Sequence, residues 1–165
     1  MPEPQIVAKP ELTVVGLQRS FIHALSPDTN NMRVIGGLWG EFVERAGAIP
    51  DRQGQEMYGV LFARPAAERS HPDELEYIAA VAVSSTARVP AGMVRQTIPA
   101  GTFAVFVHRG PIQRIAETCR YIYREWLPAS AYEHSGVADI ERYDDRFCAD
   151  SESSEMEYWI SIRPK

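Results

Sequence analysis

Two short stretches near the C-terminal end alternate acidic and aromatic residues. Glu141 is followed two positions later by Tyr143, and Glu157 is followed two positions later by Trp159. Because residues two apart on a β-strand point to the same face, each stretch should present a carboxylate beside an aromatic ring. Rings stack on flat organic cations and a carboxylate compensates their charge, so the pattern predicts a site for such a cation. An exposed strand face, on which Glu is common, would give the same alternation.

Aromatic residues elsewhere in the chain extend this hypothesis. We expect the two acidic faces to look into one shared cleft, while the alternate face of the last strand, which carries Tyr158 and Ile160, packs under a helix. Tyr58 and Tyr77 fall in earlier predicted strands, and Trp39 falls in the first predicted helix. Each of these three residues fits either the lining of the cleft or ordinary core packing.

The histidines and cysteines show no spacing typical of a metal site. The four histidines are scattered without HExxH or His-x-His, and Cys119 and Cys148 form no CxxC pair, so no metal is predicted. Neither GxGxxG nor a P-loop occurs, and no cofactor is predicted. His108, at the end of a predicted strand, either reaches the cleft or bonds a loop carbonyl. Cys119 falls on an apolar helix face, where an inert buried thiol is expected.

The hydrophobic pattern predicts strands and helices in an order that occurs twice. Extended segments are interrupted at Pro10 and Pro99, and two helices are indicated by apolar residues spaced three and four apart. The predicted elements are an extended segment at 5–19, a helix between Asn30 and Gly47, strands at 56–63 and 75–84, an extended segment at 93–108, a helix from Ile112 that ends at Pro128, a loop at 129–137, and strands at 138–143 and 155–163.

This order is β-α-β-β written twice, with halves at 1–87 and 88–165 of a single domain spanning 1–165. We therefore predict an α+β fold in which duplicated β-α-β-β units form one curved, mostly antiparallel sheet with both helices on one face. The opposite face, at the seam between the two halves, should then form a concave groove that serves as the ligand cleft.

The composition limits the class of protein. The 165 residues carry 17 Lys+Arg and 22 Asp+Glu, for a net charge of −5, and 45% are hydrophobic. These values exclude a largely disordered chain and argue against a general nucleic-acid surface, which needs clustered basic residues. No apolar run approaches the roughly 20 residues that span a bilayer, and the N-terminal stretch is not a signal peptide. A cytoplasmic protein with reduced thiols is expected.

The second half of the chain resembles a known family in the order of its motifs. AGTFAVFVHRGPI is followed by a helix that ends in REWLPAS, then by IERYDDRF and SSEMEYWISI. In this order the motifs resemble the GyrI-like effector-binding domain, a bacterial family that includes gyrase-inhibitory proteins and the ligand-sensing domains of AraC-type and MerR-type multidrug regulators. The resemblance is strong over 99–163 and weaker before it, where VVGL, LWGEF and Tyr58-Gly59-Val60 fit the pattern.

The resemblance implies the same doubled fold and a hydrophobic, aromatic-lined cleft with a key acidic residue. In drug-binding members a Glu on the penultimate strand meets the cationic centre of the ligand, and this position corresponds to Glu141. The other family positions that carry over are a second Glu and an aromatic on the last strand, at Glu157 and Trp159, and first-half aromatics at Trp39, Tyr58 and Tyr77.

Three functions remain open at this point. The first is a stand-alone effector-binding domain for small, flat, hydrophobic or cationic molecules, used in sensing or sequestration. Direct nucleic-acid contact is not expected, because no helix-turn-helix fits before the first strand, and membrane contact is not expected, because no apolar run is long enough. The second is a hydrolase of strained cyclopropane-type genotoxins, which some stand-alone family members resemble, with Glu141 or Glu157 as general acid or base, aided by Tyr143 or Tyr58. The third is a protein-interaction module, such as a gyrase modulator, in which the acidic segment 144–155 mimics a polyanion.

Overall fold

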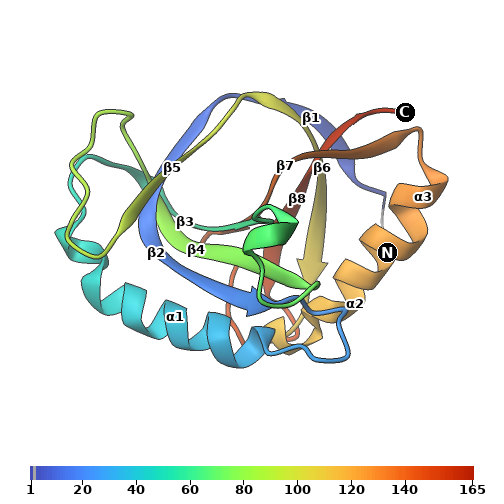
Figure 1. The fold of residues 1–165 in the computed structure, drawn as a ribbon, viewed down its shortest axis with the longest axis horizontal. Helices are drawn as coiled ribbons and strands as arrows, with labels where there is room; N and C mark the ends of the chain where they lie inside the picture. Colours follow the sequence, from blue (N-terminus) through green and yellow to red (C-terminus); the bar gives the residue numbers. More distant parts are fainter. Residues whose placement is uncertain (2) are drawn as a thin grey trace.

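The computed structural model describes residue 1 and residues 3–165, which form one eight-stranded antiparallel sheet and two helical segments (Figure 1). The strands lie in the order β1-β6-β8-β7-β3-β4-β2-β5. Their bounds are Gln5–Lys9 for β1, Leu12–Ile22 for β2, Arg52–Phe62 for β3, Glu74–Val83 for β4, Val94–Ile98 for β5, Gly101–Arg109 for β6, Tyr132–Tyr143 for β7 and Glu155–Pro164 for β8. The predicted α+β fold with a repeated element order is confirmed.

Each of the two predicted extended segments is divided by its proline into two strands that pair with different partners. The chain breaks between β1 and β2 at Pro10, and between β5 and β6 at Pro99, because proline has no N–H to donate to a ladder. The short strand β1 pairs with β6 of the second half, whereas β5 pairs with β2 of the first half. This reciprocal exchange ties the two halves together at both edges of the sheet.

The two helical segments cover one face of the sheet, as predicted. Helix α1, Asn31–Arg45, buries Leu38 and Phe42 in a cluster with Tyr77 of β4. The second segment buries Ile115 and Ile122 in a cluster with side chains of β6 and β8. Figure 1 shows α1 and the second helical segment, which runs from α2 (Ile115–Arg120) to α3 (Leu127–Ala129), along the outside of the curled sheet, with the first turns of α1 and α2 nearest each other.

The second helical segment changes its winding part-way along. A 3₁₀ turn at Ile112–Arg114 leads into α2, Ile115–Arg120, then a π-helical turn, Tyr121–Trp126, and finally α3, Leu127–Ala129. The predicted end at Pro128 is wrong by one residue, since Pro128 sits in the first turn of α3, where a missing N–H is tolerated.

The face of the sheet opposite the helices is filled, and the expectation of an open concave groove there is wrong. Tyr58, Ile140 and Trp159 of the central strands belong to one buried apolar cluster on this face. Val7 of β1 and Ile98 of β5 join the same cluster from the two edges. The sheet therefore curls around a hydrocarbon core on this side, and any ligand cavity must lie elsewhere.

The predicted loop at 129–137 is also wrong for most of its length. Strand β7 begins at Tyr132, and Tyr132 and His134 pair with Pro164 and Ile162 of β8. The register then shifts before Asp139, and Gly136 has a φ of 82°, which a glycine adopts without strain. Ser, His and Gly in this stretch are typical of a loop, and cross-strand pairing overrides that preference.

The helices are too short or too polar for a bilayer: among the described residues, none has the length and apolar character needed to cross one.

The acidic segment 144–155 is a connection between β7 and β8 whose charges are largely paired. Asp144 and Glu155 contact arginines at 2.8 and 3.3 Å, and Glu152 contacts Arg114 at 2.6 Å. The gyrase-modulator alternative, which needs free negative charge, stays a prediction without further support.

Gly16 on β2 lies at a point where the neighbouring backbone leaves no room for a side chain. It pairs with both β4 and β5, and a Cβ at this position would overlap the backbone carbonyl group of Ala79. We expect Gly16→Ala to lower the free energy of unfolding by about 3 kcal/mol, because backbone cannot move aside as a side chain does. Gly101→Ala is the control, since a Cβ there meets nothing within 4 Å and should change stability by less than about 0.5 kcal/mol. Urea unfolding followed by tryptophan fluorescence measures both, and equal effects would contradict the packing argument.

Candidate ligand-binding site

The register between the last two strands separates the two acid–aromatic pairs that were expected to share a cleft. Glu141 lies opposite Tyr158, and Arg142 lies opposite Glu157. Directly opposed residues of antiparallel strands point to the same face, so Glu141 faces the helices together with Tyr158. Glu157 and Trp159 point to the opposite face, and the expectation of a single shared hollow is wrong. The alternation within each strand was predicted correctly, but the relation between the strands was not.

Glu141 is a buried carboxylate held by two phenol groups. Its side chain is on the helix-facing side of β7, and the residue is 5% exposed. Oε2 accepts hydrogen bonds from the hydroxyl groups of Tyr77, at 2.7 Å, and Tyr143, at 2.5 Å. The indole N–H of Trp39 in turn donates to the Tyr77 oxygen at 2.9 Å. Within the described part of the chain, Oε1 makes no hydrogen bond.

A glycine allows Tyr77 to reach this carboxylate from two strands away. Tyr77 is on β4, Glu141 is on β7, and β3 runs between them. Gly59 of β3 pairs with both neighbouring strands at this level, and a Cβ there would overlap the Tyr77 hydroxyl and come within 2.9 Å of Glu141 Oε2. The absence of a side chain at residue 59 therefore opens the path for the hydrogen bond.

Two cavities lie at the seam, where β7 of the second half pairs with β3 of the first, on the side of the sheet that carries the helices. The larger cavity has a volume of about 430 Å³ and the smaller about 350 Å³. Four residues line both cavities, namely Asn31 and Ile35 of α1, Ile115 of α2, and Glu141. The carboxylate of Glu141 therefore stands between two largely apolar compartments that meet at the starts of the two helices.

The surroundings of Glu141 act on its pKa in opposite directions. Burial raises the pKa above its ordinary value of 4.5, and the negative charge of Asp139 adds to this effect. The hydrogen bonds from Tyr143 and Tyr77 lower the pKa, because they favour the charged form, but burial prevails. Burial also raises the pKa of both tyrosines well above the usual range, so both remain neutral hydrogen-bond donors.

A second carboxylate on the same face was not among the predicted site residues. Asp139 is two positions before Glu141, lines the larger cavity and is 9% exposed. Its Oδ2 accepts a hydrogen bond from the hydroxyl of Tyr123, and its Oδ1 lies 2.8 Å from Nε2 of His134. Strand alternation, applied one step further back from Glu141, would have found it.

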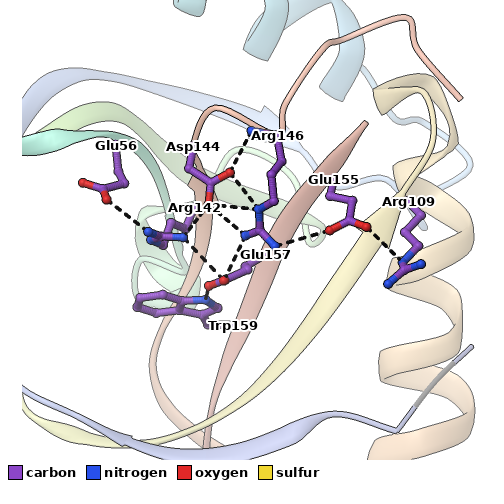
Figure 2. Close-up of polar contacts among 8 residues, drawn as sticks. All are labelled: Glu56, Arg109, Arg142, Asp144, Arg146, Glu155, Glu157 and Trp159. Atoms are coloured by element: carbon purple, nitrogen blue, oxygen red, sulfur yellow. Dashed lines mark hydrogen bonds and ion pairs between the residues drawn. The ribbon is translucent and has the colours of Figure 1, made fainter. Parts of the chain in front are cut away.

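Glu157 and Trp159 belong to a charged network on the other face. Figure 2 shows Glu157 between the guanidinium groups of Arg142 and Arg146, at 3.4 and 3.2 Å, with the Trp159 indole N–H donating to it at 2.8 Å. The ammonium group of Lys9 lies 4.1 Å from the centre of the Trp159 ring. Both the acid and the ring already have cationic partners within the protein, which leaves neither available to a cationic ligand.

The remaining predicted residues divide between the two faces. Tyr77, Tyr143 and Trp39 gather around Glu141, whereas Tyr58 packs against Trp159 with ring centres 6.4 Å apart. His108 is buried, with one ring nitrogen 3.0 Å from the carbonyl oxygen of Pro111 and the other 2.7 Å from the Thr118 hydroxyl. The loop-carbonyl interpretation of His108 thus describes the geometry, and the residue lines neither seam cavity.

Cys119 lies on the helix face that packs on the sheet and also borders the larger cavity. Burial raises the pKa of its thiol to about 12. The thiol is therefore protonated at neutral pH, and the predicted inert packing role fits this environment.

In the described residues, no group of three or more His, Cys, Asp or Glu side chains could hold a metal ion.

Comparison with known proteins decides the family. The sequence profile of the GyrI-like small molecule binding domain matches residues 2–163. The chain belongs to the GyrI-like family of small-molecule binding domains. A relative, the transcriptional regulator BrlR of Pseudomonas aeruginosa, is 32% identical over 160 residues, which are 96% of this chain and 54% of that protein. The chain thus spans about half the length of this regulator.

Solved structures share the GyrI-like fold at low sequence identity. SAV2435 bound to tetraphenylphosphonium superposes with a TM-score of 0.72 at 14% identity, covering 98% of this chain and 94% of that one. The C-terminal domain of EcmrR gives a TM-score of 0.65 at 18% identity, with 99% and 98% covered. The predicted family and fold are confirmed: the chain is a GyrI-like small-molecule binding domain, and it is related in sequence to a transcriptional regulator.

A buried carboxyl group with a raised pKa has two chemical uses. In its ionised form it is a counterion for a cation, and in its protonated form it is a general acid. Glu141 alone of the two predicted acids has the environment for either use, because Glu157 is held by arginines. The hydrolase alternative therefore also comes to depend on Glu141.

The raised pKa of Glu141 predicts a pH dependence of stability. The folded state binds this proton more tightly than the unfolded chain, so the contribution of Glu141 to the free energy of unfolding is fully present below the ordinary pKa of 4.5 and is lost as the pH rises through the raised pKa. Glu141→Gln removes the titration while its amide oxygen can still accept from the tyrosines. We expect the wild type to lose stability relative to this variant as the pH rises from 4.5 through the raised pKa. Urea unfolding across that range measures the difference, and parallel curves would contradict the shift.

Proposed function

We propose that the seam site binds hydrophobic organic cations and that Glu141 supplies the negative charge that selects them. The observation that carries the proposal is the buried carboxylate, which is held in place by two neutral phenol groups. Among the described residues it makes no ion pair, in contrast to Glu157. Burial disfavours the ionised carboxylate in the empty site, and a bound cation would offset that cost.

The surroundings of Glu141 suit such a ligand in shape and polarity. The smaller cavity is lined by Trp39, Tyr143 and Phe147, and the ring of Tyr143 contacts each of the other two edge to face. A cation above an aromatic ring gains about 2 kcal/mol when both are desolvated. Two such contacts would supply about 4 of the roughly 8 kcal/mol that micromolar affinity requires, and the carboxylate and the apolar walls would have to supply the rest.

The relatives support this ligand class and suggest a role in sensing. Tetraphenylphosphonium, with which SAV2435 was solved, carries one positive charge inside four phenyl groups. BrlR is a transcriptional regulator, and EcmrR was solved in complex with DNA. By analogy with these proteins, we propose that ligand binding to this chain serves as an effector signal. A DNA-binding domain would respond to the signal, either in the same polypeptide or in a partner protein.

A matched pair of ligands tests the role of the charge. Biphenyl-4-yl-trimethylammonium and 4-tert-butylbiphenyl have nearly the same shape and differ by one positive charge. We expect Glu141→Gln to weaken binding of the cation by at least about tenfold and binding of the neutral compound by less than about threefold, because a buried charge–charge contact is lost only for the cation. Fluorescence titration of the purified protein measures both affinities.

Glu157→Gln is the matched control, because it makes the same chemical change on the opposite face of the sheet. The amide oxygen of the glutamine can take the place of Glu157 Oε2, which accepts from the Trp159 indole, and the affinities of both ligands should stay within about twofold of the wild type. Equal losses of the two ligands in Glu141→Gln, or an equal effect of the two substitutions on the cation, would show that Glu141 has no electrostatic role.

A further inference from the structure

The larger cavity contains a second carboxylate that is held in the same manner as the first. Asp139 and Glu141 are alternate residues of β7 and both line this cavity. Glu141 receives hydrogen bonds from two tyrosines, and Asp139 receives one from Tyr123 and one from His134. The π-helical turn Tyr121–Trp126 contains Tyr123, so the unusual winding of the second helical segment contributes directly to this contact.

The partners of His134 fix the tautomer of its neutral ring. The backbone N–H of Gly136 donates to Nδ1 of His134 at 2.9 Å, so Nδ1 accepts and carries no proton in this arrangement. The ring proton is then on Nε2, which donates to Asp139 Oδ1 at 2.8 Å. The Asp139 hydrogen bond raises the pKa of His134, but a second proton would have to displace the Gly136 hydrogen bond. His134 therefore orients Asp139 at alkaline pH without cancelling its charge.

The larger cavity has no fixed positive charge in its wall. Among the described residues that line it, none is a lysine or an arginine. His23 lies at one end and is 3.5 Å from Asp73 through Nε2. The other titratable groups of the wall are Cys119, Tyr123 and Tyr158, whose pKa values are all raised by burial, together with His134, Asp139 and Glu141. At a pH above the raised pKa of His134, the cavity thus contains two carboxylates and only neutral partners for them.

The two carboxylates are close enough to act on one ligand. Alternate residues of a strand are separated by roughly 7 Å along the strand direction. Each carboxylate contributes to the electrostatic field at the other, and the charge of Asp139 indeed raises the pKa of Glu141. A cation with a single charge can compensate only one of the two acids fully, whereas a second positive charge at this spacing would compensate both.

We infer that Asp139 is a second anionic subsite and that the larger cavity takes hydrophobic dications whose two charges are spaced like alternate residues of a strand. The inference rests on the proposed function of Glu141 and extends it from the charge of the ligand to the number and spacing of its charges. Tyr123 and His134 are the positioning residues of this subsite.

Two probes of one shape test this inference. The first is para-xylylene-bis(trimethylammonium), whose charges lie about as far apart as alternate residues of a strand, roughly 7 Å. The second is (4-neopentylbenzyl)trimethylammonium, in which a carbon atom replaces one of the two charged nitrogens. The measured quantity is the ratio of the affinity for the dication to that for the monocation, by calorimetric titration at several pH values between about 8.5 and about 9.5. These values lie at least about two units above the ordinary imidazole pKa, because the pKa of His134 is raised. Because the two probes have the same shape, the contributions of shape and of most packing contacts to the affinity cancel in the ratio.

We expect Asp139→Asn to lower this ratio by at least about tenfold while the affinity for the monocation changes by less than about threefold. An unchanged ratio would overturn the inference. If Asp139→Asn fails to fold, substitutions of His134 give the same information without altering the carboxylate. His134→Gln keeps a neutral donor and should preserve the ratio, whereas His134→Arg places a permanent positive charge beside Asp139 and should lower the ratio about tenfold. Equal ratios in these two variants would also overturn it.

The two proposals fail separately. If the affinity for the monocation is insensitive to Glu141→Gln, the proposed function of Glu141 is wrong. If that affinity depends on Glu141 but the ratio is insensitive to Asp139 and to the charge at His134, only the dication subsite is wrong. Glu157→Gln should change neither quantity, because Glu157 lies on the other face of the sheet and is paired with arginines.

Discussion

A carboxylate that is held by phenol hydroxyls rather than by cations is the interaction on which the site depends. Tyr77 and Tyr143 position Glu141 through hydrogen bonds that satisfy one oxygen, yet they leave its negative charge uncompensated. An arginine in the same place would fix the carboxylate equally well but would remove its value for a cationic ligand. The protein contains that alternative on the opposite face, where Arg142 and Arg146 hold Glu157. The comparison within one chain shows why the type of partner, and not the acid itself, separates a candidate binding group from a structural one.

The fold places this carboxylate where no single half of the chain could hold it. Tyr77 comes from the first half, Glu141 and Tyr143 come from the second, and Gly59 lets the tyrosine reach across the strand between them. Both helices begin at the same seam and leave cavities on either side of the acid. The exchange of β1 and β5 between the halves holds the seam closed at the two edges of the sheet. The polar site is thus a consequence of joining two apolar units, each with its own helix and core cluster.

Because one face of the sheet is filled, the seam cavities lie on the other face. The apolar cluster that includes Tyr58, Ile140 and Trp159 occupies the inside of the curl, so the concave face is a core and not a binding groove. On the helix side, two separate helices cannot cover the whole sheet, and the gap between them remains as cavities. SAV2435 shares the overall fold of this chain, with a TM-score of 0.72. The position of the cavities therefore follows from how much surface each layer can cover.

Local periodicity in the sequence determined the strand and helix order, the apolar face of each helix, and the pairing of Glu141 with Tyr143 on one side of their strand. These features depend only on residues within a few positions of one another, and the same alternation already contained Asp139. Tertiary structure alone decided that Glu141 and Glu157 lie on opposite faces, because a shift in the register of β7 between His134 and Asp139 sets which residues of β8 they oppose. It also decided that Tyr77 and Tyr123, from other parts of the chain, hold the two acids. A strand has a period of two, so one residue of slip reverses every side chain, and no pattern within a single strand records that slip.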